Sequence, residues 1–143
     1  MIEFSKIKEV FGKHFFDFAC ECRSSKYSRM LLVKADRAFS LEHVVYVVVW
    51  KGLVIKVGET GRTFSERYSD YIQKPNSPLM KALEQVGSGK IEVYVHQVPY
   101  ATHRLGNKNF YIYEDTKQYE QIILDKVLEL SDNELPLGNP VKY

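Results

Sequence analysis

The pattern of hydrophobic and polar positions is sharpest in the middle of the chain. The segment V-V-Y-V-V-V-W (44–50) is followed by K-G and then by L-V-I-K-V-G (53–58), and both segments are rich in β-branched residues. Two such runs on either side of a short turn predict a β-hairpin. Further along, the alternating segment I-E-V-Y-V-H-Q-V (91–98) predicts a third strand.

Apolar residues at helical spacing predict four helices. The first covers residues 2 to 11. The second covers about residues 64 to 73 and opens on the capping box T-F-S-E, with Thr63 as the cap. The third and fourth cover residues 78 to 86 and roughly 116 to 130. Strands and helices together predict an α/β (α+β) fold, with a small mixed, mainly antiparallel sheet flanked by helices.

Two stretches are less regular. Residues 12 to 42 are mixed and basic and give no assignment, and residues 100 to 109 form a polar loop before a short strand or helix approach at Phe110–Tyr113. At 143 residues the chain fits one domain. We divide it into an amino-terminal extension, residues 1 to 42, and a core of residues 43 to 139.

The register of the predicted hairpin depends on its turn. A two-residue turn at residues 51–52 would place Tyr46 opposite Val57. A three-residue turn over residues 50–52, ending in a left-handed glycine, places Tyr46 opposite Lys56. We prefer the second register because it places six apolar residues on one face of the hairpin. Tyr46 and Lys56 then share the other face, with their Cβ atoms roughly 4.5–5.5 Å apart. The apolar face would consist of Val45, Val47, Val49, Leu53, Ile55 and Val57.

Composition and charge narrow the class of protein. Hydrophobic residues at 45% and charged residues at 27% are ordinary for a globular chain. The longest apolar run, residues 44 to 50, is too short to cross a bilayer, so we expect a cytoplasmic protein with no membrane partner. The net charge of +2 is mild, so affinity for nucleic acid must come from local clusters. Two clusters are present: Arg23, Lys26, Arg29, Lys34 and Arg37, and then His103, Arg104 and Lys108.

The two cysteines form a C-x-C pair, Cys20 and Cys22. This spacing is too tight for an ordinary disulfide, and there is no second cysteine pair to complete a zinc site. We interpret both as buried or neutral thiols.

A set of dispersed residues resembles the GIY-YIG nuclease superfamily. The set comprises V-V-Y (44–46), K-V-G (56–58), E-T-G-R (59–62), Arg67 and the distant Glu120. The resemblance departs from the family motif in both triplets, since the first keeps only its tyrosine and the second has Lys56 where tyrosine is usual. Compact restriction endonucleases and some phage-type members carry lysine there, followed eleven positions later by arginine, as Lys56 and Arg67 are spaced here.

The resemblance implies a metal-dependent DNA endonuclease that leaves a 5′-phosphate and a 3′-hydroxyl. Tyr46 would be the general base, assisted by Lys56, because an ordinary tyrosine with a pKa of about 10 is rarely ionised at neutral pH. Arg67 would bind a phosphate oxygen with its planar fork. Glu120 would bind Mg²⁺ or Mn²⁺.

Three further residues are candidates for substrate binding: Asn139, Arg62 and Arg104. Asn139 is spaced like the carboxy-terminal asparagine of the family, although N-P is also a turn signal. Arg62 follows the K-V-G triplet as a candidate phosphate contact, and Arg104 belongs to the basic loop. A homodimer would allow both strands to be cut.

Two alternatives remain open at this stage. The first is a catalytically inactive DNA-binding or regulatory module with the same fold, suggested by the substitution at Lys56 and the low net charge. The second is a small-molecule hydrolase that uses His96 and His103.

Overall fold

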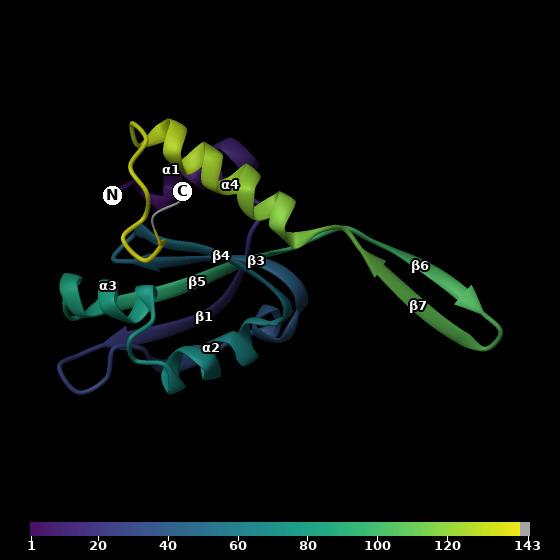
Figure 1. Cartoon of the computed structure of the whole chain (residues 1–143), viewed down its shortest axis with the longest axis horizontal. Helices are drawn as coiled ribbons and strands as arrows, with labels where there is room; N and C mark the ends of the chain where they lie inside the picture. Colours follow the sequence, from purple (N-terminus) through teal and green to yellow (C-terminus); the bar gives the residue numbers. More distant parts are fainter. Residues whose placement is uncertain (141–143) are drawn as a thin grey trace.

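The computed structural model describes residues 1–140 and contains a five-stranded antiparallel sheet (Figure 1). Its strands lie in the order β2-β1-β5-β3-β4, so β4 forms one edge. The strands are β1 (Asp17–Ser24), β2 (Leu31–Ala35), β3 (Glu42–Trp50), β4 (Leu53–Thr63) and β5 (Gly89–Gln97). Every pairing among the described strands is antiparallel, so the predicted α+β class is confirmed and the expected mixed character of the sheet is replaced by a purely antiparallel one.

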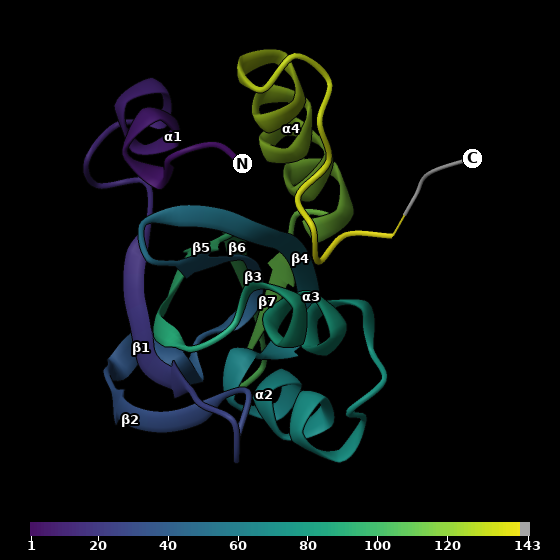
Figure 2. The same cartoon turned by 90° about the vertical axis from the view of Figure 1, so that its left-hand side faces the viewer.

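Helices cover both faces of this sheet (Figure 2). One face packs against α1 (Phe4–Phe11) and α4 (Thr116–Leu130). The opposite face packs against α2 (Phe64–Gln73), α3 (Pro78–Val86) and a 3-10 turn at Arg37–Ser40. No helix in residues 1–140 is both long and apolar enough to cross a membrane.

Alternation along β3 divides the core into two layers. Val45, Val47 and Val49 face α1 and α4, where they join a cluster with Ile7 and Ile123. Their neighbours in the sequence, Val44, Tyr46 and Val48, face α2 and α3 and pack with Phe64 and Leu83. A strand buried on both faces explains why the segment reads as a continuous apolar run.

The four helices lie where the sequence predicts them, and α2, α3 and α4 each begin at a side-chain cap, whereas α1 does not. Thr63 caps α2 by accepting a hydrogen bond from the Glu66 backbone amide at 3.1 Å. Asp115 caps α4 in the same way, accepting from the Lys117 amide at 2.9 Å. These side chains satisfy amide groups that a helix leaves unpaired at its start.

Residues 12 to 42, to which the sequence pattern assigned no element, contain the two strands β1 and β2. β1 is an inner strand paired on both sides, with β2 and with β5, so residues 17–35 belong to the same sheet as the hairpin. Cys20 and Cys22 lie on β1 as free, fully buried thiols, as expected.

The preferred register of the hairpin is wrong. Trp50 pairs with Leu53 across a two-residue turn in which Lys51 and Gly52 both have positive φ, 48° and 81°. A β-bulge then shifts the pairing by one residue, so that Lys56 lies opposite Val48 and not opposite Tyr46. The extra residue of the bulge, Ile55, turns into the core on the α2 side. A bulge inserts one unpaired residue and moves the later residues of its strand to the other face, which alternation alone does not reveal.

The predicted polar loop is also different. It forms a second, two-stranded sheet of β6 (Tyr100–Leu105) and β7 (Lys108–Tyr113), which projects from the body as an arm (Figure 1). The short strand expected at Phe110–Tyr113 is the second half of this arm.

Candidate active site

Tyr46 lies fully buried in the middle of β3, and its ring packs directly over Gly58 of β4. A Cβ atom at position 58 would lie 2.3 Å from Cζ of Tyr46, well inside van der Waals contact. Only glycine at position 58 therefore leaves room for the Tyr46 ring to lie over β4. The K-V-G triplet supplies that space.

The hydroxyl group of Tyr46 meets two side chains from α2. Its oxygen lies 2.6 Å from the hydroxyl oxygen of Tyr71, and it accepts a hydrogen bond from Nε of Arg67 at 3.2 Å. Arg67 and Tyr71 are four residues apart and so share one face of the helix, with the guanidinium carbon 5.4 Å from the Tyr71 ring. We call Tyr46, Arg67 and Tyr71 the hydroxyl cluster.

Burial and hydrogen bonding act in opposite directions on these tyrosines. Burial raises the pKa of Tyr46, and the hydrogen bonds from Tyr71 and Arg67 lower it, since both stabilise the phenolate. Burial likewise raises the pKa of Tyr71. In the folded protein at neutral pH both groups are therefore protonated, and Arg67 is the adjacent cation.

Lys56 lies on β4 two residues before Gly58, so it shares the face of Tyr46. It is partly buried, and burial lowers its pKa because the charged form loses water. The carboxylate of Glu120 opposes that shift, and the charge of Arg67 adds to it. The charges of Glu120 and Arg67 thus both act on Lys56.

Glu120 reaches this site from the opposite side of the sheet. It lies on the first half of α4, and its charge acts on both Tyr46 and Lys56 although the two faces are separated by the backbone. The edge position of β4 makes this possible, because no further strand lies beyond it. The start of α4 is tied to β4 by Thr116, whose hydroxyl donates to Glu59 at 2.6 Å.

Asn139 binds the backbone of β4 at the same place. Its side-chain amide accepts from the Val57 N–H at 2.9 Å and donates to the Val57 carbonyl at 2.8 Å. One residue earlier, the Gly138 N–H donates to the Ile55 carbonyl at 2.7 Å. Asn139 therefore holds the strand between Lys56 and Gly58 through its backbone, and its role in substrate binding stays a prediction.

Arg62 lies beside the site near the end of β4, and its side chain contacts α2. Its guanidinium binds Asp70 at 2.7 Å and approaches Glu66 at 3.5 Å. Asp70 also lies 3.9 Å from Arg67, so one carboxylate connects the two arginines. Arg62 is therefore linked to the hydroxyl cluster through Asp70.

Other candidates lie elsewhere. Arg104 is on the arm, where its Nε donates to the Gly106 carbonyl at 3.1 Å. His103 is on the arm as well, whereas His96 lies in the main sheet, stacked on Phe15 with ring centroids 3.7 Å apart. Burial lowers the pKa of His96. The structure thus gives no common site to the two histidines.

Tyr71 is the site residue that sequence reasoning missed. Its position in the apolar stripe of α2 indicated an ordinary core residue, and its ring is indeed buried. The available signal was its spacing of four from Arg67, which places both side chains on the same face. The spacing indicates a site residue only when the Tyr46 hydroxyl is known to lie against that face of the helix.

Arg67 and Glu120 each act electrostatically on Tyr46 and on Lys56, and the chemical roles of the four residues stay a prediction. Among residues 1–140 no group of three or more His, Cys, Asp or Glu side chains forms a metal cage. Mg²⁺ does not need one, since it usually keeps several waters and binds one or two carboxylates together with substrate phosphate. A single carboxylate beside two cationic side chains fits that preference.

Comparison with solved structures gives two neighbours with the same fold. The restriction endonuclease HPY188I in complex with product DNA matches with a TM-score of 0.53 and 20% identity, covering 99% of this chain and 87% of that chain. A mutant of bacteriophage T4 EndoII matches with a TM-score of 0.54 and 17% identity, covering 86% and 95%. Neither the family models nor the curated proteins give a match. The chain thus shares its fold with nucleases over most of its length.

Proposed function

We propose that this protein is a divalent-metal-dependent DNA endonuclease of the GIY-YIG kind, acting in restriction or in phage-type DNA degradation. The observation that carries the proposal is the convergence of a tyrosine hydroxyl, two cations and a carboxylate at edge strand β4. The fold shared with DNA nucleases supports it.

The two cations supply a site for a phosphodiester. The side chain of Arg67 is 39% exposed, so it is the part of the hydroxyl cluster that a substrate meets first. Its planar guanidinium binds two oxygens of one phosphate, and Lys56 adds a point charge from the neighbouring strand. Together they would hold the phosphate over the buried Tyr46 hydroxyl.

Tyr46 is the proposed general base. It would accept a proton from the attacking water, and the hydrogen bonds from Arg67 and Tyr71 would stabilise the phenolate that this requires. Lys56 acts from the same face, two residue pairs along the hairpin from Tyr46. As a cation it would favour the phenolate form of Tyr46 and help to orient the attacking water.

Glu120 would hold Mg²⁺ or Mn²⁺, which when bound neutralises charge on the phosphate and supports the departing oxygen. Attack of water at phosphorus with departure of the 3′ oxygen gives a 5′-phosphate and a 3′-hydroxyl. With one site per chain, a homodimer would cut both strands and a monomer would nick them in turn.

The test is plasmid nicking with Mg²⁺ or Mn²⁺ by wild type, Glu120→Ala and Tyr46→Phe. We expect each variant to lose about 100-fold or more in rate, the usual cost of removing one essential group. Glu129→Ala is the matched control, because Glu129 lies on the same helix, is exposed and bonds only to Lys126 among the described contacts.

Two outcomes would count against the proposal. Clean wild-type protein that fails to nick over a range of metals and pH would favour a catalytically inactive DNA-binding module. Nicking that survives both Glu120→Ala and Tyr46→Phe would place the chemistry elsewhere.

A further inference from the structure

The arm of β6 and β7 is the part of the molecule that makes least contact with the rest. Its strands pair with each other in a two-stranded sheet, separate from the main one (Figure 1). Every residue from Tyr100 to Ile112 is exposed, and Tyr113, at the base, is half-buried. A lone two-stranded hairpin is at best marginally stable in water, so a surface of this kind indicates a binding partner.

The two faces of the arm differ in chemistry. Residues directly opposite each other share a face, and alternate pairs belong to the same face. One face consists of three pairs: Tyr100 with Tyr113, Thr102 with Tyr111, and Arg104 with Asn109. Contacts of the Tyr100 ring with those of Tyr111 and Tyr113, at centroid distances of 5.7 and 5.0 Å, confirm that these three tyrosines lie together. We call this the polar face. The other face carries Ala101, His103, Leu105, Lys108, Phe110 and Ile112.

The arm also carries the excess charge of the chain. Lys and Arg number 20 against 18 Asp and Glu, and residues 100–113 include Arg104 and Lys108 but no Asp or Glu. The remainder of the protein is therefore balanced at 18 charges of each sign. A projection with only positive charges on a neutral body complements a polyanion.

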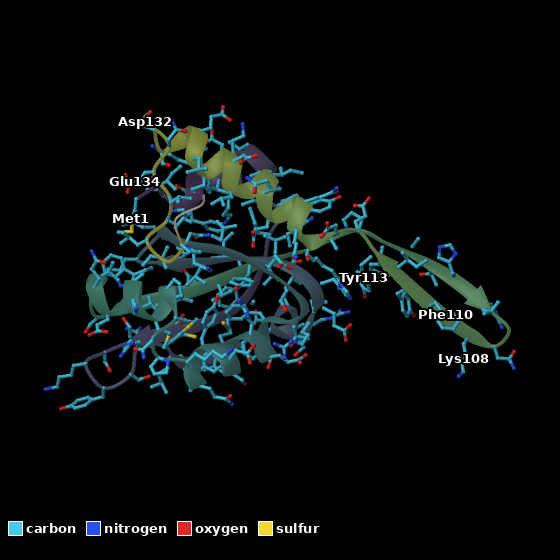
Figure 3. The ribbon with its side chains drawn as sticks, in the orientation of Figure 1. Met1, Lys108, Phe110, Tyr113, Asp132 and Glu134 are labelled. Carbon is cyan, nitrogen blue, oxygen red and sulfur yellow. The ribbon has the colours of Figure 1, made fainter. Side chains whose placement is uncertain are left out.

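The base of the arm adjoins the candidate active site. Tyr113 stacks on His43, with ring centroids 3.9 Å apart, and α4 begins three residues later. Glu120 lies in the second turn of that helix. Lys108 and Phe110 lie in the outer half of the arm and Tyr113 lies at its base (Figure 3). A duplex bound at the active site would thus lie within reach of the arm.

We propose that the arm is a β-ribbon that enters the major groove of duplex DNA next to the cleaved phosphate, with the polar face toward the base edges. The proposal rests on the proposed function for its substrate class. The major groove is wide enough for a two-stranded ribbon. Six residues per strand span about 20 Å, which corresponds to about six base pairs along the duplex at roughly 3.4 Å each.

The residues of the polar face suit this role. Arg104 and Asn109 lie directly opposite each other near the tip, and these two side-chain types make bidentate contacts to guanine and to adenine. Thr102 and the tyrosines add hydroxyl groups and flat rings along the same face. The rival occupant is a second copy of this chain, packed on Leu105, Phe110 and Ile112. The absence of acidic residues from the arm favours DNA, because self-association would bring like charges together.

The first experiment shortens the arm without changing its base. Ala101 and Ile112 are directly opposite, so residues 102–111 can be replaced by Asn-Gly, which forms a two-residue hairpin turn. Binding to a labelled 30-base-pair duplex is measured by fluorescence anisotropy in EDTA, where cleavage does not interfere. We expect at least about tenfold weaker binding, with unchanged circular dichroism and an unchanged oligomeric state by light scattering.

The second experiment tests the face with single substitutions. Arg104→Ala should weaken binding by about three- to tenfold and reduce the slope of log affinity against log salt by about one. Asn109→Ala should alter the preference among duplexes of different sequence. Lys81→Ala removes an exposed cation from α3 on the body and is the matched control, expected to have less than about a twofold effect.

Several results would overturn the inference. They are a wild type that does not bind duplex DNA, a shortened arm that binds as tightly as wild type, and an Arg104→Ala variant equal to the Lys81→Ala control. A change from dimer to monomer on shortening the arm, or in a Leu105→Ala, Phe110→Ala double variant, would assign the arm to a second copy instead. Arm-dependent DNA binding without any nicking would support this inference and overturn the proposed function alone.

Discussion

The hydroxyl oxygens of Tyr46 and Tyr71 lie 2.6 Å apart, although the two residues belong to a central strand and a surface helix. Both are almost completely buried, with exposed fractions of 0% and 5%. A hydrogen bond between two protonated tyrosines becomes stronger when one of them ionises. The hydrogen bond from Tyr71 therefore stabilises the phenolate form of Tyr46.

The first expected outcome concerns the pH dependence of cleavage. Tyr71→Phe removes a hydrogen bond that lowers the pKa of Tyr46, so that pKa should rise and the rising limb of rate against pH should move to higher pH. At neutral pH the rate should fall by roughly two- to tenfold, the worth of one hydrogen bond. The measurement is single-turnover plasmid nicking from pH 6 to pH 10.

Tyr68→Phe is the control for that experiment. Tyr68 lies on the same helix, but its hydroxyl donates to the Met30 carbonyl at 2.9 Å and accepts from the Leu32 amide at 3.2 Å, away from Tyr46. Its removal should leave the pH profile in place. A Tyr71→Phe profile that is lower at every pH without a shift would show that Tyr71 has a packing role only.

A second expectation concerns Gly58. An added methyl group at this position would lie 2.3 Å from the Tyr46 ring, so Gly58→Ala should cost about 1–3 kcal/mol in the free energy of unfolding. Gly61→Ala is the matched control on the same strand, where the new methyl group would contact His43 at an ordinary 3.7 Å. Urea denaturation measures both, and Tyr46→Ala in the Gly58→Ala background should recover part of the loss if the ring is what clashes.

The third expectation concerns alkaline stability. Tyr46 and Tyr71 have a raised pKa in the folded state, so their contribution to stability is complete below about pH 10 and is lost as pH rises toward the folded value. Over that range each group should reduce the free energy of unfolding by about 1.4 kcal/mol per pH unit. Tyr71→Phe should remove one such contribution, and Tyr27→Phe, at an 86% exposed position, is the control. Equal slopes for all three proteins would contradict the assignment.

The fourth expectation concerns Asn139. Its two hydrogen bonds to Val57 fix β4 between Lys56 and Gly58, so Asn139→Ala should lower stability by about 1–3 kcal/mol and expose the Val57 amide to hydrogen exchange. Asn139→Asp should do no better, because a carboxylate cannot donate to the Val57 carbonyl. Asn76→Ala, at an exposed position, is the control. If exchange at Val57 is unchanged in Asn139→Ala, the asparagine does not hold the strand.

Short-range sequence patterns predicted most of the secondary structure. The capping signals at Thr63 and Asp115 act over two or three residues, and the β-branched runs around residues 51–52 predict a hairpin whatever lies beyond them. β1 was missed because its eight residues include Asp17, Glu21 and Arg23, which interrupt the apolar pattern, while its partner β5 lies about 70 residues away.

By itself, then, the sequence determined the hairpin and the four helices, since these follow from local spacing, and the family resemblance selected Tyr46, Lys56, Arg67 and Glu120 as the candidate site residues. Tertiary structure alone decided the register and the neighbours of Tyr46. The two-residue turn and the bulge at Ile55 together place Gly58, not Lys56, across from the tyrosine, and α2 brings Tyr71 to its hydroxyl. Both depend on how the hairpin packs beneath a helix, and the energy of that packing is shared among residues distant in the chain, so no local pattern encodes it.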